Sequence, residues 1–347
     1  MDIPQRVPAY VPLFGVTRGP LVESVHYGAF AVVDRQGRLL AAAGPIMVPV
    51  FMRSSAKPFQ VLPLLEDGGA DRWALSDEEI AVMAASHSGT ERHVAVVQGL
   101  HQRLGLGPQH LQCGVHPPLH RESALALRMT GQEPTPYHHN CSGKHTGMLA
   151  LALLHGWPLE TYLDPDHPVQ QRIRHTVAEM AGMSPEDVLI GMDGCSAPNF
   201  ALPLYHAAWA YARLVDPQDL PEPRRGAASR VVQAMMAHPF MVAGPERFDT
   251  RVMEALSGQL VAKGGAEGYQ GIGLLPGVAG EQGIGIAIKI ADGDGRRRAA
   301  SAVALEILRR LGVLTQEAAQ ALSDLGPQPP VRNIRGDVQV GQGQPLF

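Results

Sequence analysis

Residues 51–59 read Phe-Met-Arg-Ser-Ser-Ala-Lys-Pro-Phe, and the prediction of fold and function starts from them. Ser54 and Lys57 stand three positions apart, a spacing that places both side chains on one face of a helical turn. On such a turn the lysine amine can take the hydroxyl proton and activate the serine as a nucleophile. Ser55 is a competing nucleophile, but its side chain would point elsewhere on the turn. Because Ser-x-x-Lys also occurs on ordinary solvated helices, the pair gains meaning only from the rest of the chain.

Composition limits the classes of protein that the sequence can encode. The chain has 347 residues, 45% of them hydrophobic and 18% charged, with a net charge of −4. This length supplies an ample core, and we predict a single domain over residues 1–347. No basic surface for nucleic acid is indicated, and no apolar run reaches the ~20 residues that cross a bilayer. Residues 1–6 lack the apolar core of a signal peptide, so we expect a cytoplasmic protein.

The chain has an odd number of cysteines, Cys113, Cys141 and Cys195, which lie far apart in sequence. A disulfide framework is therefore not expected, and reduced thiols or metal ligands are the alternatives.

Strand patterns occur at both ends of the chain and helical patterns in the middle. We expect a sheet built from about residues 21–50 and 258–300, and a helical region over about 54–256. Within that region Ser76 and Glu79 form a capping box that begins a helix. The predicted fold class is α/β (α+β), with one antiparallel sheet from the N- and C-terminal strands and an inserted helical region.

Two further stretches support a role for the Ser54 turn. Ser86-His87-Ser88 ends a predicted helix, and Lys263-Gly264-Gly265 ends a predicted strand. Taken alone, the first fits a helix cap and the second a solvated lysine before a turn. Together with Ser54 and Lys57, however, they follow the order of motifs in the β-lactamase/transpeptidase fold. The chain departs from that pattern at two positions, because Ser88 and Gly264 replace the usual Asn and hydroxyl residue.

Two cysteine-containing stretches are the most distinctive in the sequence. Residues 139–147 read His-Asn-Cys-Ser-Gly-Lys-His-Thr-Gly, and residues 191–198 read Gly-Met-Asp-Gly-Cys-Ser-Ala-Pro. A cysteine where a loop joins a helix favours the thiolate, and two thiolates with nitrogen donors suit zinc. A third ligand would come from His139, His145, Asp193 or Lys144. The alternative is a pair of buried free cysteines. The sequence contains no His-Glu-x-x-His motif, so a zinc hydrolase of that type is not indicated.

Taken as an ordered set, these motifs resemble the rhizobial-type L-asparaginases, the class 3 group. The resemblance covers about Glu23 to Asp337. It rests on Arg53-Ser54-Ser55-Ala56-Lys57-Pro58, Ser86-His87, Cys113-Gly114-x-His116, Asn140-Cys141-Ser142-Gly143-Lys144-His145, Asp193-Gly194-Cys195 and Lys263-x-Gly265-x-Glu267-Gly268.

The resemblance implies a fold like that of serine β-lactamases and glutaminases, a homodimer, and hydrolysis of L-asparagine to L-aspartate and ammonia. The catalytic residues would be Ser54 with Lys57 and Ser86 with Lys263, and Asp193 would lie nearby. Zinc would be held by Cys141, Lys144 and Cys195. From the chemistry of its side chain, we expect Arg53 to orient an anionic substrate group by a bidentate contact, and we predict Gly265 and Glu267 as further substrate-binding residues.

Two alternatives remain at this point. The first is a glutaminase or another β-lactamase-like serine amidohydrolase, such as an esterase or peptidase. The second is a non-catalytic relative that binds an amino acid or metal. Loss of a serine or lysine from the two pairs would favour such a relative, and all four residues are present.

Overall fold

The computed structural model describes residues 7–347. Residues 1–6, on which the expectation of a cytoplasmic protein depends, lie outside the described residues. In the part of the chain that is described, no helix is long and apolar enough to cross a membrane.

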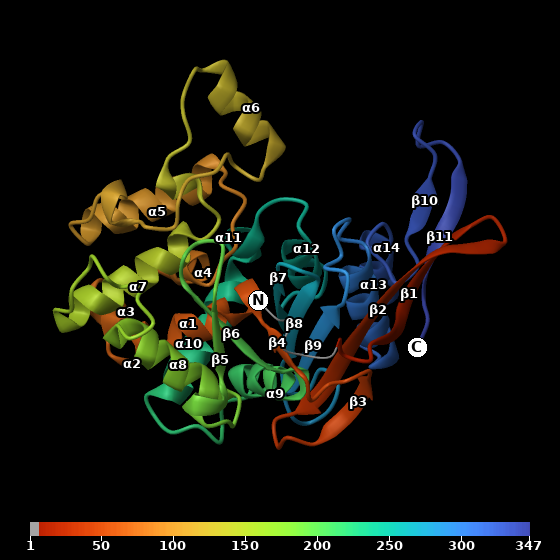
Figure 1. Cartoon of the computed structure of the whole chain (residues 1–347), viewed down its shortest axis with the longest axis horizontal. Helices are drawn as coiled ribbons and strands as arrows, with labels where there is room; N and C mark the ends of the chain where they lie inside the picture. The colour runs from red at the N-terminus through yellow and green to blue at the C-terminus, as the bar shows by residue number, and fades with distance from the viewer. Residues whose placement is uncertain (1–6) are drawn as a thin grey trace.

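One large antiparallel sheet joins the two ends of the chain, as predicted (Figure 1). Its strands run in the order β10 (Pro330–Arg332), β11 (Gln339–Pro345), β1 (Val11–Arg18), β2 (Leu21–Asp34), β9 (Ile284–Ile290), β8 (Tyr269–Leu274) and β7 (Leu260–Gly265), and β3 (Leu39–Ala43) also pairs with β2. The N-terminal strands thus lie beside strands from beyond residue 259, and the helical region is inserted between them. The predicted fold class is confirmed.

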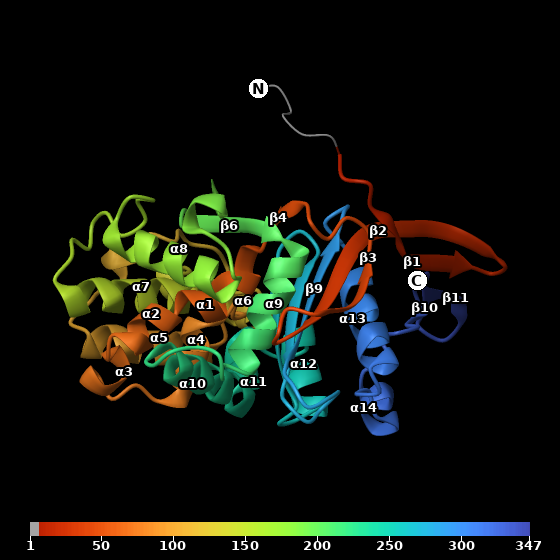
Figure 2. The ribbon, with the colours of Figure 1, turned by 90° about the horizontal axis from the view of Figure 1, so that it is seen from below.

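The centre of the sheet is buried on both faces. In β2, residues 29–33 are small or β-branched apart from Phe30, and all are at most 5% exposed. Helix α9 (Leu204–Val215) packs on β2 and β9, and α13 (Ala299–Arg310) contacts β9 and β1. Figure 2 shows these two helices on opposite faces of the sheet. A strand covered on both sides needs a nearly continuous apolar run, which explains this sequence.

The helical region lies on the side of the sheet where β7 forms the edge (Figure 1). It contains α1 (Lys57–Gln60), α2 (Leu62–Glu66), α3 (Gly69–Arg72), α4 (Asp77–Met83), α5 (Glu91–Arg103), α6 (Arg121–Met129), α7 (Ser142–His155), α8 (Pro168–Met180), α10 (Arg224–Ala237), α11 (Pro239–Ala243) and α12 (Phe248–Ala255). A small second sheet joins β4 (Pro49–Phe51), β6 (Pro198–Pro203) and β5 (Leu189–Met192). Helix α14 (Gln316–Ala321) follows α13.

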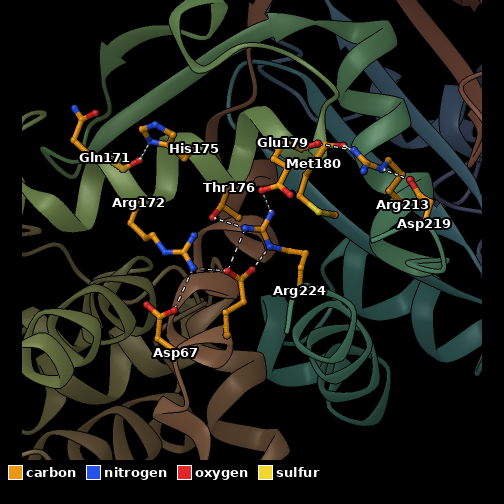
Figure 3. Close-up of polar contacts among 11 residues, drawn as sticks. Asp67, Gln171, Arg172, His175, Thr176, Glu179, Met180, Arg213, Asp219 and Arg224 are labelled. Carbon is orange, nitrogen blue, oxygen red and sulfur yellow. Dashed lines mark hydrogen bonds and ion pairs between the residues drawn. The ribbon is translucent and has the colours of Figure 1, made fainter. Parts of the chain in front are cut away.

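A buried ion cluster ties three helices of this region together. The Glu66 carboxylate of α2 accepts hydrogen bonds from Arg224 of α10 and from Arg172 of α8, at 3.1 and 2.8 Å. Figure 3 shows both arginines, with Asp67 also bonded to Arg172. The Glu66 and Arg224 side chains are 2% and 6% exposed. Because a buried charge is costly without a partner, this cluster favours one packing of the three helices.

Candidate active site

The Ser54 turn lies between the small sheet and the edge of the large one. After β4, residues Arg53–Ala56 form a short 3₁₀ helix, and α1 begins at Lys57. Arg53 has a positive φ of 52°, a conformation that is uncommon for a residue with a side chain. Ser54 is half-buried, whereas Lys57 is only 1% exposed. The predicted helical turn is therefore present, and its lysine points into the protein.

The Lys57 amine contacts groups from two distant segments. It donates hydrogen bonds to the Ser86 hydroxyl at 2.9 Å and to the Ala85 carbonyl at 2.6 Å. It also lies 3.1 Å from the Cys141 sulfur. Within residues 7–347, the Ser54 hydroxyl makes no hydrogen bond. Of the predicted serines, Ser86 is thus the one whose hydroxyl contacts the Lys57 amine.

Ser55 has a different environment from Ser54. Its side chain is fully buried and donates to the backbone carbonyl of Lys263, while its own carbonyl accepts a 2.8 Å hydrogen bond from Tyr211. The Ser55 side chain therefore links the turn to β7 by a hydrogen bond. Of the two serines, Ser54 has the more accessible hydroxyl group.

Gly265 permits β7 to approach the Ser54 turn closely. A Cβ atom at this position would lie 2.6 Å from the Met52 carbonyl oxygen, which is too close for any other residue. Steric fit therefore explains why the predicted Lys-x-Gly motif ends in glycine. The absence of a side chain lets the strand that carries Lys263 lie against the turn.

Lys263 is buried, with 1% of its side chain exposed. Burial lowers its pKa to about 7, although the nearby Asp249 carboxylate raises it. The Lys263 amine donates to the Gly264 carbonyl at 2.7 Å and lies 3.7 Å from Asp249. A lysine in this setting exchanges its proton close to neutral pH.

The two cysteine-containing stretches meet beside Lys57. Cys141 precedes α7, and the Lys144 amine in the first turn of that helix lies 3.0 Å from the Cys195 sulfur. A hydrogen bond from Cys195, with the charges of Lys57 and Lys144, lowers the pKa of Cys141 well below its ordinary value, although burial opposes the shift. Burial also opposes charge on Lys144, but the two sulfurs raise its pKa. Two sulfurs and the amine nitrogens of Lys57 and Lys144 thus share one small, buried region.

Gly143 explains how α7 reaches this position. A Cβ atom there would lie 2.1 Å from the Val82 carbonyl oxygen of α4. Only glycine allows the two helices to approach so closely, and α4 leads directly to Ser86.

The donor set must include Lys144 if it is to hold a metal. Among residues 7–347, no group of three His, Cys, Asp or Glu side chains could hold one. His139 accepts a hydrogen bond from the Cys141 amide at 3.0 Å, and His145 Nδ1 lies 2.6 Å from the Tyr162 hydroxyl. Cys141, Lys144 and Cys195 fit zinc by their chemistry, because thiolate sulfur and neutral nitrogen are its usual ligands. Metal binding would require Lys144 to lose its proton.

Arg53 and Asp193 form an ion pair at the mouth of the site. Asp193 Oδ1 accepts from Arg53 Nε at 3.0 Å and lies 2.8 Å from Nη2. Although burial opposes it, the charges of Lys144 and Arg53 lower the pKa of Asp193. The Arg53 amide donates to Asn199 at 3.1 Å, which fixes the strained backbone at this residue.

A cavity of about 540 Å³ opens beside this ion pair. Its lining is Val50, Phe51, Arg53, Gly191, Met192, Asn199, Glu267 and Lys289. Arg53 and Glu267, two of the predicted substrate-binding residues, therefore share a cavity. The predicted serines and the lysines Lys57, Lys144 and Lys263 are not among its lining residues in the described part of the chain.

Three residues of this region were not predicted from the sequence, namely Asp249, Asn199 and Lys289. Asn199 and Lys289 lie on strands, and Asp249 lies in the first turn of a helix. None of them belongs to a recognisable motif, so only their proximity in the fold identifies them.

The sequence matches the L-asparaginase II family over residues 14–344, and the protein belongs to this family. The resemblance drawn from the motifs is therefore confirmed, and the protein is an amidohydrolase that acts on a small molecule.

A comparison with curated proteins gave no match. Similar solved structures include a Bacillus glutaminase, 12% identical, over 82% of this chain and 91% of that chain with a TM-score of 0.39. They also include a β-lactamase from Mycobacterium bovis, 15% identical, over 82% of this chain and 94% of that chain with a TM-score of 0.40.

Proposed function

We propose that the protein hydrolyses L-asparagine to L-aspartate and ammonia through a serine nucleophile activated by lysine. The observation that carries this proposal is the buried hydrogen bond from Lys57 to Ser86, one helical turn from the accessible Ser54 hydroxyl. Buried amines hydrogen-bonded to hydroxyl groups are suited to moving protons, which amide hydrolysis requires at each step.

In this proposal Ser54 attacks the side-chain amide carbon of asparagine, the C–N bond breaks as ammonia leaves, and water then hydrolyses the acyl-serine ester to release aspartate and free Ser54. Lys57 accepts the proton, and Ser86 passes protons between Lys57 and Lys263. Since burial brings the pKa of Lys263 to about 7, this lysine can deliver a proton to the departing ammonia and recover it near neutral pH.

The substrate carries a carboxylate and an ammonium group next to the reacting side chain. Arg53 can bind the carboxylate, and Asp193 can bind the ammonium group. These two residues bind each other in the structure, so the substrate would replace one ion pair with two. Glu267 and Gly265 would complete the binding site beside the cavity.

We also propose that Cys141, Lys144 and Cys195 hold a zinc ion. When bound, the ion would supply a fixed positive charge near the substrate and hold the two cysteine loops together. The assembly we propose is a homodimer, and the support for this part is the resemblance described above. We also propose a cytoplasmic location.

The test is ammonia release from L-asparagine and from L-glutamine by the wild-type protein and by Ser54→Ala. We expect release from asparagine in preference to glutamine, and its loss in Ser54→Ala without loss of folding. Ser55→Ala is the matched control, because it removes a structural hydrogen bond but leaves the nucleophile. Substantial turnover by Ser54→Ala would assign the attack to Ser86, and faster release from glutamine would make the protein a glutaminase.

A further inference from the structure

A buried carboxylate outside all of the sequence motifs lies directly beside Lys263. Asp249 stands in the first turn of α12 and is 6% exposed. Its Oδ2 atom lies 3.7 Å from the Lys263 amine, whose side chain is 1% exposed. Two charges at this distance interact strongly when little water separates them.

The same carboxylate also binds the backbone around Lys263. Oδ2 accepts a 2.8 Å hydrogen bond from the Gly264 amide, and Oδ1 accepts a 3.1 Å hydrogen bond from the Gln270 side chain. The peptide bond between Lys263 and Gly264 is therefore held at both ends, because Ser55 donates to its carbonyl oxygen. One acidic side chain thus contacts both the amine of Lys263 and the strand that carries it.

We propose that Asp249 is a positioning residue for the hydrolytic reaction, whose carboxylate holds the Lys263 amine and the end of β7 in place and keeps that amine able to carry a proton. This inference rests on the proposed function, in which Lys263 exchanges a proton during turnover. Within residues 7–347, Asp249 makes no hydrogen bond or ion pair with the serines or the cavity residues, so it acts through Lys263.

The charges around Lys263 explain why such a residue is needed. Burial lowers the pKa of Lys263, and the Lys57 and Arg247 charges lower it further, whereas Asp249 and Cys141 raise it. Of the charges that face this amine, Asp249 has the largest effect. Without its carboxylate, Lys263 would be neutral at pH 7 and could no longer donate a proton to a leaving group.

The experiment measures the protonation of Lys263 directly. The chain contains four lysines, Lys57, Lys144, Lys263 and Lys289, so uniform ¹³C labelling of lysine gives four Cε signals. The Lys263 signal is the one missing from Lys263→Arg. We expect Asp249→Asn to move the midpoint of its titration to lower pH by about 1–3 units, the usual effect of an opposite charge at this distance.

Asp216→Asn is the matched control. Asp216 is also buried, accepts a hydrogen bond from the amide of Gly283, just before β9, at 2.9 Å, and pairs with Arg35 at 3.0 Å. The Asp216→Asn substitution should leave the midpoint of the Lys263 titration unchanged. The pH dependence of kcat/KM should shift with the Lys263 signal in Asp249→Asn and not in Asp216→Asn. An unchanged Lys263 midpoint in folded Asp249→Asn would overturn the proposal.

A measurement on the wild-type protein covers the case in which Asp249→Asn does not fold. The ¹³C signal of the Asp249 carboxyl group should move over the pH interval in which Lys263 titrates, and a signal that does not respond overturns the proposal. Neither titration depends on turnover. If the signals are coupled but Lys263→Met still hydrolyses asparagine, the proposed catalytic role of Lys263 is wrong, while the contact with Asp249 stands.

Discussion

The Lys57 amine donates a 2.9 Å hydrogen bond to the Ser86 hydroxyl, although 29 positions separate the two residues in sequence. Both side chains are buried, at 1% and 7% exposure. Motif spacing alone pairs Lys57 with Ser54, whereas the fold adds Ser86 as a second hydroxyl within reach of the same amine. In the proposed mechanism, Lys57 would exchange its proton with Ser86, the serine of the second predicted pair.

Ser86→Ala should lower kcat for asparagine by about 10²–10⁴-fold, the usual contribution of a positioned proton-transfer group. KM should change little, because Ser86 is not among the residues that line the cavity. Steady-state ammonia release measures both constants.

Ser88→Ala is the control, since this buried hydroxyl, two positions later, donates to the Ala243 carbonyl at 2.6 Å. It should cost about 1 kcal/mol of stability and spare kcat. Equal losses of kcat in the two variants would argue against the role of Ser86.

Glu66→Gln should lower the free energy of unfolding by up to about 3–5 kcal/mol, because it leaves the buried Arg224 with Glu179 alone as a charged partner, and the Glu179 side chain is 51% exposed. Urea unfolding at neutral pH measures this loss. The control is Glu23→Gln, which removes an ion pair to Arg18 whose side chains are 53% and 48% exposed, and which should cost less than about 1 kcal/mol. Similar losses in both variants would show that burial does not determine the strength of the Glu66 cluster.

The sequence predicted the elements whose signals are local. The capping box at Ser76 and Glu79 is present at the start of α4, and β2 and β3 lie within the sheet segment predicted over about residues 21–50. Strands β1 and β11 were not predicted, because proline and several glycines interrupt their patterns. They form because β2 extends beyond the central sheet and offers its edge to β1, to which β11 then pairs.

The candidate site shows the same division. The short motifs identified the serines, lysines and cysteines that the fold then brings together. The sequence did not show that Lys57 contacts Ser86, because that distance depends on how α1 and the end of α4 are packed. It also did not distinguish Asp249 from any acidic residue in the first turn of a helix, where such residues are common.

Cys141→Ala should remove zinc from the protein, because it takes away one of the two sulfurs of the proposed donor set. Protein purified without chelator should contain about one zinc ion per chain, measured by mass spectrometry of the metal. Cys141→Ala should raise KM for asparagine more than it lowers kcat. Cys113→Ala is the control, because Cys113 is equally buried, at 3% exposure, but lies outside the donor set. A wild-type protein without zinc, or Cys141→Ala with an unchanged zinc content, would exclude the site.

Lys263→Met should change how stability depends on pH. Burial lowers the pKa of Lys263 from 10.5 to about 7 in the folded protein, so between these values the unfolded chain binds more protons than the folded one. The wild-type protein therefore gains stability as the pH rises through this interval, while Lys263→Met does not gain this contribution. Between pH 7 and 9.5 the wild type should gain about 3 kcal/mol relative to the variant, by the linkage of protonation to unfolding.

Urea unfolding of both proteins at the two pH values measures the difference, and Lys289→Met, which replaces a half-buried lysine, is the comparison. If Lys263→Met and the wild type have the same pH dependence, Lys263 keeps its ordinary pKa in the folded protein, and it cannot be the group that exchanges a proton at neutral pH.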